Sequence, residues 1–119
     1  MSNEDDKTFF SEFIDAELTQ IKISQFIVHF VFVEGYEVAV ESSFEHLNES
    51  NELVSHFDVY GQTKDVTVHQ LLGAKVVNVH SDEDILHIGF SYGGSIKIFP
   101  KKQPYESYAV YLKEKHYVV

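Results

Sequence analysis

The sequence predicts an α+β domain whose antiparallel sheet is built from two repeated β-hairpin units, at about residues 20–43 and 74–99. The first observation is an internal repeat, in which Ile27–Val40 matches Ile85–Ile98 at an offset of 58 residues. The second is the alternation of apolar and polar residues in both stretches, which is typical of β-strands. The third is a helical spacing of apolar residues near the N-terminus. The identities within the repeat are Ile27 and Ile85, His29 and His87, Phe32 and Phe90, and Gly35 and Gly93.

Two helices are expected beside the sheet. An N-terminal helix is predicted from Lys7 to Leu18, because its apolar residues fall on one stripe that would pack on the sheet. A short central helix is predicted from Asp65 to Leu72, closed by Gly73, although β-branched residues weaken its first turn. The apolar stripe of the N-terminal helix consists of Phe9, Phe10, Phe13, Ile14 and Leu18.

Each hairpin is expected to turn through a three-residue loop that ends at Gly35 in the first copy and Gly93 in the second. This register pairs Phe30 with Val38, and in both copies it places apolar residues opposite apolar residues or glycine. Both glycines should therefore have positive φ. The opposite face of the hairpins is mixed, so we expect a helix or a partner chain to cover part of it. The predicted core residues are Phe30, Phe32, Ile88 and Phe90.

No flexible linker separates the two copies, which predicts a single domain over residues 1–119 with the internal repeat at 20–43 and 74–110. A polar connection follows the first copy, and a Pro-containing insertion follows the second hairpin. Further strands are expected at Leu53–Tyr60, Tyr105–Leu112 and His116–Val119.

The composition excludes several classes of protein. Nineteen acidic residues against nine lysines give a formal net charge of -10, and arginine is absent, which argues against binding to nucleic acid or to an anionic membrane. No apolar run reaches membrane-spanning length, and the N-terminus does not resemble a signal peptide. The lack of cysteine excludes disulfides and fits a reducing compartment. We therefore expect a cytoplasmic protein.

Three stretches together, LLGAKVVNV, IGFSYGGSIKI and PYESY, resemble a family of small uncharacterised bacterial α+β domains. In that family an F-x-x-G hairpin is followed by Tyr-Glu-Ser/Ala-aromatic, which Tyr105, Glu106, Ser107 and Tyr108 match here. The resemblance covers about residues 20–112 and implies a compact α+β domain. Some members are suspected immunity proteins, encoded near toxin genes. The resemblance implies no catalytic residue.

The repeated histidines raise the question of a metal site. His29 and His87 would approach each other if the hairpins packed about a two-fold axis, and Glu41 or Glu106 could complete a zinc site. No histidine spacing typical of a zinc motif is present, so we assign no metal or other cofactor. The simpler interpretation is that a duplication copied one half-exposed strand position. Glu41 and Glu106, each followed by serine, could alternatively act as paired carboxylates in hydrolysis or accept structural hydrogen bonds.

The sequence favours a non-catalytic protein-binding domain, because it contains no phosphate loop, nucleophile elbow or catalytic triad. An immunity or inhibitor protein for a basic partner would fit the negative charge. One alternative is a small-ligand or metal-binding protein, or a hydrolase, that uses the repeated histidines and glutamates. Another is a structural domain that self-associates, for example as a homodimer. The candidate partner-binding residues are Glu37, Glu41, Asp82, Glu83, Asp84, Tyr105 and Tyr108.

The charge balance generates a first testable prediction. We expect no binding to random duplex or single-stranded DNA or RNA at physiological salt, because phosphate contacts require a positive surface. A filter-binding titration checks this, and a sub-micromolar dissociation constant would contradict it.

Overall fold

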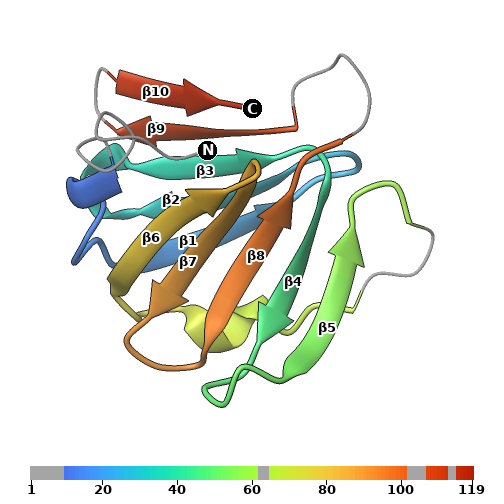
Figure 1. Ribbon diagram of the computed structural model, residues 1–119, viewed down its shortest axis with the longest axis horizontal. Coiled ribbons are helices and arrows are strands. Elements are labelled where there is room, and N and C mark those ends of the chain that lie inside the picture. Colours follow the sequence, from blue (N-terminus) through green and yellow to red (C-terminus); the bar gives the residue numbers. More distant parts are fainter. Residues whose placement is uncertain (1–9, 62–64, 102–106, 113–114) are drawn as a thin grey trace.

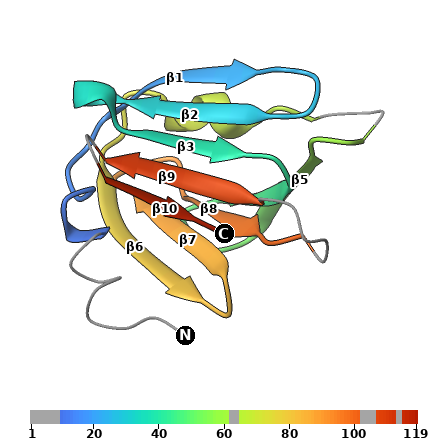
Figure 2. The same ribbon diagram turned by 90° about the horizontal axis from the view of Figure 1, so that it is seen from above.

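The computed structural model describes residues 10–61, 65–101, 107–112 and 115–119, and over these residues the fold is a sandwich of two five-stranded antiparallel sheets. The first sheet has the strand order β1-β2-β3-β9-β10, and the second has the order β5-β4-β8-β7-β6. The strands of the two sheets cross each other where the sheets stack (Figure 1; Figure 2). The strands are β1 (Leu18–Ile23), β2 (Val28–Phe32), β3 (Glu37–Val40), β4 (Ser43–Leu47), β5 (Leu53–Asp58), β6 (Val76–Asp82), β7 (Ile85–Phe90), β8 (Ser95–Phe99), β9 (Tyr108–Leu112) and β10 (Lys115–Val118).

The predicted α+β class is wrong, because the described residues contain no α-helix and only two isolated 3-10 turns, η1 (Val33–Gly35) and η2 (Val68–Leu71). The part of the predicted N-terminal helix that is described, from Phe10 onward, makes one turn and then enters β1. Phe10 and Phe13 are nevertheless buried, at 3% and 0% exposure. A single turn over the end of the sandwich thus buries Phe10 and Phe13, whereas Ile14 of the predicted apolar stripe is exposed.

The predicted central helix is the 3-10 turn η2. Its backbone bond from Leu72 N to His69 O, at 3.2 Å, spans three residues rather than four. The β-branched residues Val66, Thr67 and Val68 disfavour an α-helix at this point. Val68 and Leu71 are buried, so the turn closes the sandwich in the way that Phe10 and Phe13 do in the first half.

The three-residue hairpin loops are confirmed. Val38 pairs with Phe30, and the equivalent Ile96 pairs with Ile88. The loops close with backbone bonds of 2.8 Å from Phe32 N to Tyr36 O and of 3.0 Å in the second copy. Gly35 and Gly93 both have a φ of 80°. The four predicted core residues are also confirmed, since Phe30, Phe32, Ile88 and Phe90 are all at most 7% exposed.

The two halves of the chain exchange strands. Strands β1, β2 and β3 are joined in their sheet by β9 and β10 of the second half, and β6, β7 and β8 are joined by β4 and β5 of the first. The chain changes sheets at Glu41–Ser42, between β3 and β4, and again between β8 and β9. Each sheet therefore takes three strands from one half of the chain and two from the other.

The halves meet at an antiparallel bridge between Glu17 and Lys75, two positions that are themselves 58 residues apart. The backbone bonds around it come in equivalent pairs: Leu18 N to Ala74 O and Val76 N to Ala16 O, each 2.9 Å, and Asp15 N to Val76 O and Gly73 N to Leu18 O, each 2.8 Å. Asp15 and Gly73 also share positive φ values, of 73° and 88°. A pseudo-two-fold axis therefore passes through this bridge.

A β-bulge occurs at the same position in each half. The register shifts between Leu18 and Gln20 in β1 and between Val76 and Asn78 in β6, so Thr19 and Val77 are the extra residues. The register beyond each bulge is the same in both halves. The structural correspondence thus extends well outside the stretches whose sequences match.

The core lies between the two sheets and is rich in aromatic contacts. Phe44 of β4 meets Phe30 edge-on at 5.3 Å and stacks on Phe57 at 4.9 Å between ring centroids. Phe13 meets Phe32 edge-on at 4.6 Å. The described residues contain no α-helix that could cover the outer hairpin face, and the expected alternative, a partner chain, stays a prediction.

The equivalent loop glycines give a matched test of backbone strain. Gly35→Ala should lower the free energy of unfolding by about 1 kcal/mol, since it strains a left-handed residue and its Cβ would meet nothing within 4 Å. Gly93→Ala should cost about 2–3 kcal/mol, since its Cβ would also lie 2.9 Å from the carbonyl oxygen of Gln70. Urea unfolding of both variants measures the difference, and equal costs would contradict the steric argument.

Candidate functional site on the second sheet

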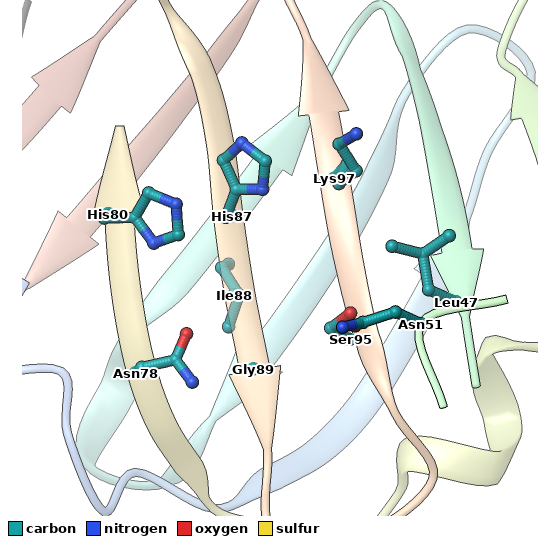
Figure 3. Close-up of a pocket in the computed structure, with 9 residues that line it drawn as sticks. All are labelled: Leu47, Asn51, Asn78, His80, His87, Ile88, Gly89, Ser95 and Lys97. Atoms are coloured by element: carbon teal, nitrogen blue, oxygen red, sulfur yellow. The ribbon is translucent and has the colours of Figure 1, made fainter. Parts of the chain in front are cut away.

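A groove of about 420 Å³ crosses the outer face of β6, β7 and β8 in the second sheet (Figure 3). Its volume lies in the range of small-ligand sites. Four strands, β4, β6, β7 and β8, and the loop between β4 and β5 contribute to it. The lining residues are Leu47, Asn51, Asn78, His80, His87, Ile88, Gly89, Ser95 and Lys97.

The floor of the groove is low because its central positions carry small side chains. Gly89 of β7 lies opposite Asn78 on one side and Ser95 on the other. A Cβ on Gly89 would lie 2.5 Å from Asn78 Nδ2, so the amide of Asn78 packs directly on the glycine. The bulge at Val77 sets the register that brings Asn78 to this place. A second depression of about 250 Å³ continues past Ser95 toward Glu49.

Two histidines form one wall of the groove. His80 of β6 is directly opposite His87 of β7, and their rings stack with 4.4 Å between centroids and 7° between planes. Burial lowers the pKa of His87 from its ordinary value of 6.5, and His80 and Lys97 lower it further, while Asp82 raises it. His87 therefore favours its neutral form more than an ordinary histidine does.

A polar row runs across the whole sheet through this wall. Register places Lys97 of β8 beside His87, and Glu45 of β4 beside Lys97. His56 of the edge strand β5 follows, with its Nδ1 3.6 Å from Glu45 Oε2. The ammonium of Lys97 also lies 6.0 Å from the ring centroid of Phe99. Positive and titratable groups thus concentrate on one face of an otherwise acidic protein.

The equivalent face of the first sheet has a different surface. The positions that correspond to Gly89 and Ser95 are Val31 and Glu37. Glu37 contacts His29 through a hydrogen bond between Oε1 and Nδ1, so the histidine that corresponds to His87 already has a carboxylate partner. At these two equivalent positions the second sheet, where the groove lies, carries smaller side chains than the first.

The predicted approach of His29 to His87 does not occur. His29 alternates with the buried Val28 and Phe30 and so points out of the first sheet. His87 alternates with the buried Leu86 and Ile88 and points out of the second. The two-fold relation places the histidines on opposite outer faces, separated by the core. Within the described ranges, no group of three or more His, Asp or Glu residues is placed to bind a metal.

The other predicted site residues are dispersed. Glu41 is half-buried at the corner between the sheets, where its backbone N donates to Ser107 O at 2.8 Å. Glu37 is half-buried on the first sheet, beside His29. Tyr105 and Glu106 lie outside the described residues. The pairing of Glu41 with Glu106 therefore stays a hypothesis.

Tyr108, a predicted partner-binding residue, is buried and therefore not available to a partner. Tyr108 has 0% exposure, and its hydroxyl donates to the carbonyl oxygen of Asp84 at 2.6 Å. Asp82, Glu83 and Asp84 are exposed, as expected, in the turn between β6 and β7. Tyr108 is thus a core residue that holds this acidic turn.

The groove residues other than His87 were missed from the sequence. For His80 a signal was available, because a two-residue turn at Glu83–Asp84 makes His80 and His87 equidistant from it and hence cross-strand neighbours. For Lys97 the hairpin loop gives the same kind of signal, because the register that pairs Ile88 with Ile96 places Lys97 opposite His87. Asn51 had no such signal, since it reaches the groove only through the non-local pairing of β4 with β8.

Comparisons with protein-family models, with curated proteins and with solved structures found no match. Over the described ranges, no helix has both the length and the apolar character needed to cross a membrane.

The lowered pKa of His87 predicts a pH effect on stability. His87 takes up a proton less readily in the folded state than in the unfolded state, where its pKa is near 6.5. Its contribution to stability is full above that value and is lost as the pH falls toward the folded pKa. When the pH is lowered from about 7.5 to about 5, the free energy of unfolding of the His87→Gln variant should therefore fall less than that of the unmodified protein. Urea unfolding across this range measures it, and an unchanged slope would refute the assignment.

Proposed function

We propose that this protein is a non-catalytic domain that binds a basic protein partner. The observation that carries the proposal is the exposed turn Asp82–Glu83–Asp84, which presents three consecutive carboxylates at the end of the second sheet. Three adjacent carboxylates produce a stronger local negative potential than the same charges scattered over the surface, and this potential attracts a basic surface.

The turn keeps its acidic residues at a conformational cost. Asp82 pairs with Ile85, so Glu83 and Asp84 form a two-residue turn with φ values of 50° and 64°. Such turns favour asparagine, aspartate and glycine, and the second position is normally glycine, so Glu83 and Asp84 are an unfavourable pair there. Strained residues at an exposed position are a reason to consider a functional role.

The equivalent turn of the first half, Ser24–Ile27, does without this strain. It closes through the backbone bond from Ser24 N to Ile27 O at 2.9 Å. Neither Gln25 nor Phe26 has a positive φ, and neither carries a charge. The acidic left-handed turn is therefore a property of the second half and not a requirement of the fold.

A residue of the first sheet holds the acidic turn in place. The hydroxyl of Tyr108, which comes from the first sheet, holds the backbone of Asp84 at 2.6 Å. A contact between the two sheets thus restrains the turn, so a partner need not immobilise it. This rigidity supports a recognition role more than a role as a solvated loop.

An inhibitor of a basic protein, such as the immunity protein of a nuclease toxin, is the role that we infer from these features. Nucleases carry positive surface for their substrate, and an acidic protein complements it. The proposal places the protein in the cytoplasm, where the lack of cysteine is ordinary.

The test uses the product of a neighbouring gene as the candidate partner and measures association by stopped flow. The triple variant Asp82→Asn, Glu83→Gln, Asp84→Asn should slow association about tenfold at low salt and change dissociation much less. The difference from the unmodified protein should shrink as ionic strength rises, because salt screens long-range attraction.

A charge-matched control is available in Asp15→Asn, Glu34→Gln, Asp65→Asn, since these three residues are exposed and lie away from the turn. Both variants lose three negative charges, so equal slowing would attribute the effect to net charge and contradict the role of the turn. Salt-independent association with the unmodified protein would remove the electrostatic mechanism.

A further inference from the structure

We propose that the groove on the second sheet binds a small molecule through an oxyanion, either a carboxylate or a phosphate. This site is separate from the acidic turn, and ligand binding in the groove does not depend on whether the turn binds a partner.

The first argument is the charge of the lining. The chain has 19 acidic residues, yet no carboxylate is among the described residues that line the groove, whereas one lysine and two histidines are. Nearby acids are already engaged or lie at the margin. Glu45, the cross-strand neighbour of Lys97, lies outside the lining and has its Oε2 3.6 Å from His56 Nδ1. Glu49 accepts from Gly93 N at 3.1 Å, and Asp82 lies at the turn beyond His80.

The second argument is the supply of hydrogen-bond donors. Lys97 offers an ammonium, and the stacked rings of His80 and His87 offer N–H groups. Asn78 and Asn51 add amide N–H groups from two sides, and Ser95 adds a hydroxyl (Figure 3). Lysine and neutral donors can together hold an oxyanion without the arginine that this chain lacks.

The third argument is the difference between the two halves. In the first sheet, Glu37 occupies the position of Ser95 and bonds to His29. In the second sheet the carboxylate is missing, and an open groove takes its place beside His87. In the first sheet the carboxylate of Glu37 accepts a hydrogen bond from His29. A ligand oxyanion in the groove would accept one from the equivalent His87.

The experiment titrates the ¹⁵N-labelled full chain with inorganic phosphate and, separately, with citrate, at constant ionic strength. Saturable shifts confined to amides of β6, β7, β8 and the loop before β5 are expected. Lys97→Met, which removes the charge but keeps most of the stem, should weaken binding about tenfold or more. Ser95→Glu introduces the residue that the other half carries in the same strand position, and it should abolish binding.

The matched control is Lys22→Met, because Lys22 pairs with His29 on the first sheet as His80 pairs with His87 on the second. It should leave the affinity within about twofold, since a distant exposed charge is screened. Tighter binding of phosphate would indicate a phosphate ester, and tighter binding of citrate an organic acid; either supports the site. Non-saturable shifts over the whole surface, or equal effects of Lys22→Met and Lys97→Met, would overturn it.

Discussion

The antiparallel bridge between Glu17 and Lys75 is the contact on which the rest of this structure depends. It pairs each half of the chain with the equivalent segment of the other, through backbone bonds that are the same in both directions. From these segments β1 and β6 continue into different sheets, and the last two strands of each half complete the sheet of the opposite half. Strand exchange, the bulges and the buried turns at Phe13 and Leu71 are all consistent with this single symmetric contact.

The parts of the fold that could be predicted from the sequence are those set by local pairing. The alternation around Phe30 and Val38 determines a hairpin register, and a glycine at positive φ determines its loop. The helix could not be corrected from the sequence, because Phe10 and Phe13 have the same spacing whether one turn or three are formed. The pairing of Val40 with Tyr108 joins residues far apart in the chain, and no local pattern encodes it.

The candidate site could be predicted only in part, for a related reason. His87 was identified because the repeat marks it, but the repeat also indicated the wrong partner, His29. A two-fold axis through the core turns equivalent outer faces away from each other, so matching residues on those faces cannot meet, whereas the matching core residues Phe32 and Phe90 stack at 6.4 Å between ring centroids. The neighbours of His87 are instead His80, set by a hairpin, and Lys97, set by the next strand.

The exchange of strands between the halves also bears on how such a fold can arise. A chain of half the length, with one buried turn and five strands, could form the same sandwich as a symmetric homodimer, each subunit donating its last two strands to its neighbour. Any site on such a dimer would be present in both subunits, and every mutation would alter both copies of the site together. Joining the halves in one chain removes that constraint, and the contrast between Glu37 and Ser95 is the kind of divergence it permits.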